Sequence, residues 1–404
     1  MKKVAAALAA LVLAHVSQAA EVDKPLLAKA EKQKPEVLQL LGRMVNIDSG
    51  TFNGRGLDAV GALATAELKK LGGRIETSSA APAAGHNIVA TFTGKGKGRI
   101  LLVAHMDTVF ADGTAKARPF RIEGSRAYGP GIMDDKGGIV MTIGALKMLQ
   151  GFKDYAKITV LLNTNEETGS HGTRALIEKL AKEHDVAFNL EPGRSADGLV
   201  IARKGSGEIE MDVKGKAAHA GVAAKEGRNA ALEAAHQVVQ LSKLGDDAKQ
   251  TTVNWTVIKS GDRSNVIPDH ASAQADVRVA VAEEFDRVEH DIERISSQKL
   301  IPETQVAIHL RRGFPPMPAS PITDAIAQRA TGIYAELGRK LTLESTGGAA
   351  DASLIFAAGV PTLDGLGIVG GGIHTAEEYA EVDSIVPRLY LLARLMQEYG
   401  RGAQ

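Results

Sequence analysis

Residues 101–108 read LLVAHMDT, an apolar run that ends in His105 and is followed two residues later by Asp107. A bounded apolar run of this length is typical of a buried strand. Ligands of an open α/β sheet gather beyond the carboxyl ends of its strands, so polar side chains at such an end are candidates for a functional site. This stretch therefore predicts a central strand with the candidate site at its end.

Strands and helices alternate on both sides of this run. We expect strands at 87–92, 100–104, 158–163 and 186–190, and helices at 35–47, 57–71, 138–149 and 172–181. This order predicts an α/β domain with a mixed sheet and helices on both faces. Residues 322–400 return to helical and apolar patterns, and we expect them to complete the same domain.

Between 205 and 315 the pattern changes. Strands are expected at 208–213, 251–259, 271–280 and 305–311, with helices at 229–244 and 283–298. The order β-α-β-β-α-β is that of a small ferredoxin-like sandwich. We therefore predict a first domain of residues 20–204 and 316–404, interrupted by an inserted domain of residues 205–315. Its sheet is expected to expose an edge, and such edges often pair across a dimer axis.

The N-terminus has the pattern of a secretory signal. Lys2 and Lys3 precede an apolar run at 4–16, and Ser17-Gln18-Ala19 is a small-residue cleavage site. We predict a signal peptide at 1–19 and a periplasmic or secreted mature protein that starts near Ala20. A short membrane anchor is the alternative, but the run is too short to cross a bilayer comfortably.

Composition limits the possible partners. The chain has 404 residues, and its 48 basic and 48 acidic side chains give a formal net charge of zero, which argues against a nucleic-acid partner. No second stretch is long and apolar enough to span a membrane, so no membrane partner is expected. Cysteine is absent. A bound metal must therefore be held by His, Asp and Glu.

Such residues recur after the expected strands and turns. They are His105, Asp134, Glu166, Glu167, Glu191 and His374. Zinc accepts imidazole nitrogen and carboxylate oxygen, and two ions can share a bridging carboxylate, for which Asp134 is suited. Asp107 is placed to orient His105, and one member of the glutamate pair can act as a general base. Each residue alone has a structural explanation, so their joint position carries the prediction.

The motifs that contain these residues resemble those of a known superfamily. They are His105-Met106-Asp107, Gly129-Pro130-Gly131, Asp134-Asp135-Lys136-Gly137-Gly138, Glu166-Glu167, Glu191-Pro192 and His374. The pattern is similar to that of the co-catalytic zinc amidohydrolases, which include glutamate carboxypeptidases, acetylornithine deacetylase, succinyl-diaminopimelate desuccinylase and aminoacylases. Within them the chain most resembles the periplasmic, folate-cleaving glutamate carboxypeptidases, over nearly its whole length.

The resemblance implies a role for each residue. One zinc is expected at His105, Asp134 and Glu191, and a second at Asp134, Glu167 and His374. Glu166 is then the general base, Asp107 supports His105, and the peptide bond after Asp134 is cis. The first domain becomes the catalytic zinc domain, and the inserted domain becomes the dimerisation or lid domain.

The resemblance extends into the inserted domain. His219, in the segment 216–221, is similar to a histidine that stabilises the oxyanion in the partner subunit's active site, which implies a homodimer. On residues alone, His219 reads as a loop histidine. Substrate contacts are implied for Asn265, Arg278, Arg311 and Gly348, although Arg312 leaves the register of Arg311 open. Ala350 stands where many members carry Thr, which leaves the substrate less defined.

We therefore predict a zinc-dependent exopeptidase that releases C-terminal glutamate, or a similar amino acid, from N-acyl, folate-like or peptidyl conjugates. The first alternative is a deacylase for another N-acyl-amino acid, of the deacetylase or desuccinylase type. Export argues against it, because those enzymes are biosynthetic and cytosolic. The second is a periplasmic binding protein without catalysis. The presence of Glu166 beside Glu167 argues against it, because a binding protein needs no base beside its ligand.

Overall fold

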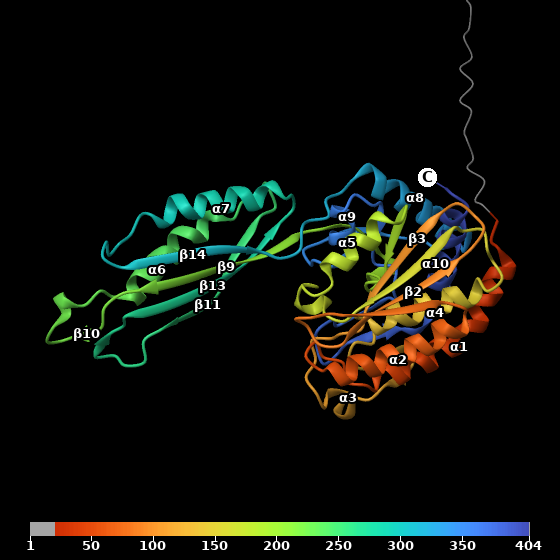
Figure 1. The fold of residues 1–404 in the computed structure, drawn as a ribbon, viewed down its shortest axis with the longest axis horizontal. Coiled ribbons are helices and arrows are strands. Elements are labelled where there is room, and N and C mark those ends of the chain that lie inside the picture. Colours follow the sequence, from red (N-terminus) through yellow and green to blue (C-terminus); the bar gives the residue numbers. More distant parts are fainter. Residues whose placement is uncertain (1–20, 404) are drawn as a thin grey trace, which may run out of the picture.

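The computed structural model describes residues 21–403, so the predicted signal peptide at 1–19 lies outside the described residues. Figure 1 shows two lobes side by side. We call the part built on β9, β11, β13 and β14 the inserted lobe, and the rest the main lobe. Among the described residues, none of the helices has the length and apolar character needed to cross a membrane.

The main lobe is built on a six-stranded mixed sheet. Its order is β1 (Arg74–Ser79), β2 (His86–Thr93), β6 (Lys157–Asn163), β3 (Arg99–His105), β7 (Val186–Asn189) and β16 (Thr362–Leu363). β3 runs parallel to both β6 and β7, whereas β2 is antiparallel to β6. The parallel centre brings the carboxyl ends of β3, β6 and β7 to one edge.

Both faces of this sheet are covered, as the apolar character of residues 101–104 predicts. Ile100 and Leu102 face a large core, while Leu101 and Val103 face a smaller one. The large core is lined by α1 (Lys24–Val45), α2 (Gly54–Lys70), α4 (Lys136–Met148), α8 (Pro321–Glu336) and α10 (Ile385–Gly400). The smaller core is lined by α5 (Arg174–Lys182) and α9 (Asp351–Ala357). The predicted α/β sheet with helices on both faces is confirmed.

One helix differs from its prediction. α1 begins at Lys24, not at residue 35, and it runs through Pro35. The buried side chains of Leu26 and Ala30 pack against the core, so tertiary packing stabilises turns that precede the proline.

Short elements complete the main lobe. They are α3 (Thr114–Ala117), the sheet of β4 (Arg121–Glu123), β5 (Arg126–Tyr128), β17 (Gly370–Gly371) and β18 (Tyr379–Glu381), and the parallel pair β8 (Leu199–Arg203) and β15 (Leu343–Thr346). The sheet of four short strands joins residues 121–128 to residues 370–381. This pairing brings the segment after β5 close to the chain around His374.

The inserted lobe has the predicted order of elements. They are β9 (Gly205–Lys214), α6 (Ala230–Leu241), β11 (Thr252–Ser260), β13 (His270–Val279), α7 (Glu283–Ser296) and β14 (Gln305–Arg312). The antiparallel sheet has the order β11-β13-β9-β14 and shares a separate core with α6 and α7. A two-stranded arm of β10 (Ala218–His219) and β12 (Val266–Ile267) lies at the far end (Figure 1). We propose residues 205–315 as the extent of this domain.

Candidate metal centre and active site

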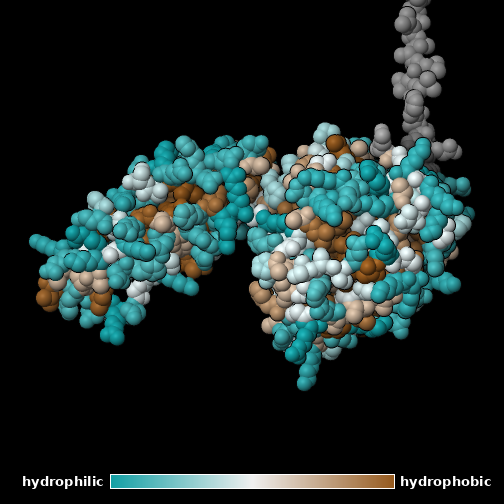
Figure 2. Space-filling model, viewed as in Figure 1, coloured by the Kyte–Doolittle hydropathy of each residue, from teal (hydrophilic) through white to brown (hydrophobic). Residues whose placement is uncertain are grey.

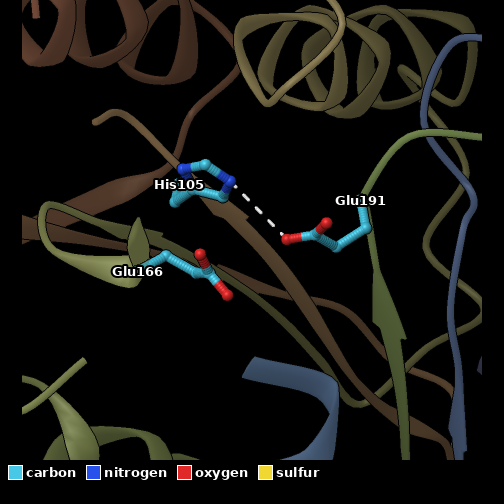
Figure 3. Close-up of side chains that lie close together, drawn as sticks. All are labelled: His105, Glu166 and Glu191. Carbon is cyan, nitrogen blue, oxygen red and sulfur yellow. Dashed lines mark ion pairs between the residues drawn. The ribbon is translucent and has the colours of Figure 1, made fainter. Parts of the chain in front are cut away.

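Three parallel strands deliver polar side chains to one edge of the main sheet. β3 ends at His105, β6 leads into the short helix at Glu166–Thr168, and β7 is followed shortly by Glu191. Figure 3 shows the side chains of His105, Glu166 and Glu191 converging on a common space. The arrangement follows from the parallel pairing of β3 with β6 and β7.

Asp134 lies between two histidines. Its Oδ1 is 2.9 Å from Nε2 of His105, and its Oδ2 is 3.2 Å from Nε2 of His374. Glu191 Oε1 lies 3.5 Å from Nε2 of His105, and Glu167 Oε2 lies 3.2 Å from Nε2 of His374. The donors therefore form two groups that share Asp134.

The position of Glu166 makes it a further possible donor. Ligand atoms of His105, Glu166 and Glu191 lie within 4.8 Å of one another, as do those of His105, Asp134 and Glu167. Glu167 is the member of the glutamate pair that contacts His374. If Glu167 is a metal ligand and Glu166 is the base, donors lie on both sides of Asp134. These individual roles stay proposals.

Asp107 is fully buried and joins His105 to the glutamate pair. Nδ1 of His105 is 3.0 Å from the Asp107 carbonyl oxygen, which leaves Nε2 facing the carboxylates. The Asp107 carboxylate accepts N–H bonds from Glu166 at 3.0 Å and Glu167 at 3.2 Å, and a hydroxyl bond from Thr51 at 2.8 Å. This network orients the ligands without contributing a donor to either group.

The electrostatics of the site favour a bound cation. Burial, together with neighbouring carboxylates, raises the pKa of Glu166 well above its ordinary value and that of Glu167 to about 7. Among residues 21–403, the buried Oε1 of Glu167 finds no hydrogen-bond partner. Crowded carboxylates with an unsatisfied oxygen and two imidazole nitrogens suit a divalent metal such as zinc. The residues present therefore fit the predicted metal.

Three further residues support the site, and two of them, Glu378 and Arg203, were not identified from the sequence. Glu378, buried beside the site, accepts N–H bonds from the segment that contains Asp134. Asp351 accepts hydrogen bonds from Asn163 and Ser170, next to the glutamate pair. Arg203 lies 3.5 Å from Glu191 and pairs with Asp364. The sequence offers little signal for them, because their partners are far along the chain. The peptide bond from Asp134 to Asp135 is cis, as the resemblance implied.

A cavity of about 660 Å³ opens between the two lobes beside these donors. Its walls include Gly348 and five arginines, which are Arg194, Arg203, Arg278, Arg311 and Arg312. Nε and Nη2 of Arg278 donate to the Asp276 carboxylate at 2.8–3.1 Å, and Arg311 contacts Glu208 at 2.9 Å. The cavity thus combines an acidic donor set with a guanidinium-rich wall.

The sheet determines which of the two neighbouring arginines, Arg311 or Arg312, lies on the same face as Arg278. Arg278 and Arg311 lie on its open face, because their strand neighbours Val277 and Leu310 point to the core. Arg312 lies on the helical side, where it contacts Asp286 and Glu289 of α7 at 2.6 Å each.

Two predicted residues lie away from this cavity. His219 is exposed on β10, at the end of the inserted lobe farthest from the main lobe (Figure 1). The carbonyl of Asn265 accepts the N–H of Ala220 at 2.9 Å, so Asn265 lies beside His219. The structure therefore brings Arg278, Arg311 and Gly348 to the cavity of this chain, but not His219 or Asn265.

Comparison with known proteins defines the class. The model of peptidase family M20/M25/M40 matches residues 101–398, and the chain belongs to this family. Carboxypeptidase G2 of Pseudomonas sp. (strain RS-16) is 40% identical over 405 residues, which cover 99% of this chain and 98% of that protein. The predicted superfamily is confirmed, and with it a hydrolase of the metallopeptidase class. The family is metal-dependent, in agreement with the donor set.

Solved structures show the same fold at low identity. Aminopeptidase PepT from Bacillus cereus has a TM-score of 0.78 at 21% identity, covering 91% of this chain and 98% of that one. The metallo-carboxypeptidase Sso-CP2 from Sulfolobus solfataricus has a TM-score of 0.72 at 16% identity, covering 90% and 99%. Both confirm the fold over nearly the whole chain.

Proposed function

We propose that this chain is a zinc-dependent carboxypeptidase that releases C-terminal glutamate, or a similar amino acid, from N-acyl, folate-like or peptidyl conjugates. The observation that carries the proposal is the cavity in which a two-sided metal-donor set faces a wall of arginines. Arginine pairs well with a carboxylate, the group that distinguishes a C-terminal residue. The full-length similarity to a carboxypeptidase supports the reaction type.

We assign His105, Asp134 and Glu191 to one zinc, and Asp134, Glu167 and His374 to the other. Bound zinc would polarise the scissile carbonyl and promote ionisation of the attacking water. Glu166 accepts the proton from this water and passes it to the leaving amine. Burial and the neighbouring Glu191 carboxylate raise the pKa of Glu166, which favours uptake of a proton by this side chain.

Arg278 and Arg311 are proposed to hold the substrate carboxylate. Both lie on the open face of the inserted sheet, where it continues into the cavity. Asp276 holds the Arg278 guanidinium through two of its nitrogens, which limits the entropy lost when a carboxylate binds. Gly348 also lines the cavity, in the loop that precedes α9.

His219 is proposed to stabilise the oxyanion in a partner subunit, with Asn265 beside it. The arm lies too far from the cavity of its own chain for a role there (Figure 1). The inserted lobe also offers a surface for dimerisation. α6 exposes Leu232 and Val239, which are 51% and 63% accessible, and Figure 2 shows apolar residues on this lobe. β11 is an unpaired edge of the sheet.

A panel of N-acyl-amino acids, assayed with zinc-loaded protein, tests the proposed function. We expect release of glutamate from benzoyl or pteroyl conjugates, and loss of this activity with a chelator. Preferred cleavage of acetyl- or succinyl-amino acids would favour the deacylase alternative. Binding without turnover would favour a binding protein.

We also propose that the chain is exported and that the leader at 1–19 is removed. The charge and apolar pattern of that leader supports this. N-terminal sequencing of the exported protein is expected to start near Ala20.

A further inference from the structure

Glu378 is a buried carboxylate that is only 1% accessible. It lies four residues after His374, where the chain enters β18. Its Oε2 accepts the N–H of Gly131 at 2.8 Å, and its Oε1 accepts those of Met133 at 2.9 Å and Asp134 at 3.1 Å. A carboxylate that accepts three backbone N–H bonds is a strong local anchor.

These three bonds join two segments that contribute donors to the same group of the metal site. One segment carries Asp134, which faces both histidines, and the other carries His374. The loop at His374 is a compact turn in which Gly372 accepts the N–H of Thr375 at 3.0 Å. His374 itself has a φ of +63°, in the left-handed region, so its conformation depends on the surrounding contacts.

We propose that Glu378 is a positioning residue, which holds the His374 loop against the Asp134 segment and thereby sets the position of His374 relative to the shared donor Asp134. The inference rests on the proposed metal-dependent function. Glu378 itself belongs to neither group of candidate metal donors.

Glu378→Gln tests this arrangement directly. The amide offers a single acceptor oxygen, and its NH₂ group then faces at least one backbone N–H. We expect the dissociation constant of the more weakly held zinc to rise about 10- to 100-fold, the usual cost of losing a group that orients metal ligands. We also expect a changed visible absorption spectrum when cobalt replaces zinc. Glu377→Gln is the matched control, because Glu377 is adjacent and exposed; its zinc affinity should stay within about twofold of wild type.

Zinc titration against a competing chelator, with circular dichroism on the same samples, provides the measurement. A folded Glu378→Gln variant with wild-type zinc affinities and cobalt spectrum would overturn the inference. If that variant does not fold, Glu378→Asp, which keeps the charge on a shorter side chain, is titrated instead. Wild-type values in Glu378→Asp would overturn the inference equally.

The wild-type titration separates this inference from the proposed function. If wild-type protein binds two zinc ions and Glu378→Gln does too with equal affinity, only the role of Glu378 fails. If wild-type protein binds no zinc, the proposed function fails and the role of Glu378 fails with it.

Discussion

Glu166 and Glu167 are adjacent in sequence but have different surroundings. Glu167 contacts His374, whereas Glu166 lies in a group with Glu191, in which ligand atoms are within 4.8 Å of one another. Asp107 accepts the backbone N–H of both and so fixes the turn that separates their side chains. At the scale of the residue, one turn thus supplies two carboxylates for two different tasks.

Glu166→Ala is expected to keep zinc but to lower kcat by about 10²- to 10⁴-fold, the usual contribution of a general base. Hydrolysis of an N-acyl-glutamate and the zinc content of the same preparation are the measurements. Full activity would remove Glu166 from the mechanism. Loss of one zinc together with activity would instead make Glu166 a ligand, which its distance to His105 and Glu191 permits.

At the scale of the element, His184 joins the helix α5 to the strand β6 of the main sheet. His184 follows α5 and lies buried between this helix and β6. Its Nδ1 donates to the Leu180 carbonyl at 2.6 Å, and its Nε2 accepts the Thr159 hydroxyl at 2.8 Å. The ring is thus bound as a neutral imidazole, and burial lowers the pKa of His184 from 6.5 to about 4.

This pKa predicts a pH dependence of stability. The unfolded chain binds the proton near pH 6.5, while the folded chain resists it until about pH 4. Stability should therefore fall as pH decreases across this window, by about 2 kcal/mol at pH 5. His184→Gln lacks this titration, so its thermal midpoint should fall less than that of wild type between pH 7.5 and pH 5. Equal falls would contradict the assignment.

At the scale of the whole molecule, the proposed mechanism requires a residue that lies outside the cavity of its own chain. The metal donors and the arginines share one cavity, but His219 lies at the opposite end of the inserted lobe (Figure 1). A second subunit, paired through α6 or β11, would supply the missing histidine. In the proposed dimer the main lobe holds the candidate metal donors, and the inserted lobe provides the dimer contacts and the arm with His219.

Mixed dimers test this division. His219→Ala and Glu166→Ala homodimers are each expected to be nearly inactive. A heterodimer of the two carries one site with wild-type Glu166 and wild-type His219, so mixing should restore up to about half of the wild-type activity per such dimer. Subunit exchange followed by an assay provides the measurement. Absence of recovery in verified heterodimers would place His219 in its own chain's site or outside the mechanism.

Many candidate site residues could be predicted because each lies close in sequence to the end of an expected strand. His105 ends an apolar strand, and the glutamate pair follows another such strand closely. Parallel strands bring such ends together, so the donor set follows from the pattern of elements. Glu378 was not predicted, because its acceptor role depends on N–H groups 244–247 residues away.

The sequence by itself determined the α/β class and the inserted β-α-β-β-α-β unit, because periodicity is a property of neighbouring residues. Its motifs also indicated the candidate metal donors. The tertiary structure alone decided which of Arg311 and Arg312 lies on the face of Arg278, and how Glu378 joins the Asp134 segment to the His374 loop. It also placed β10, which carries His219, far from the cavity of its own chain. These features depend on how segments distant in sequence pack together, and on the face of the sheet to which each side chain points. Residues 101–108 could therefore predict the edge of the sheet that carries the site, but not the segments that complete it.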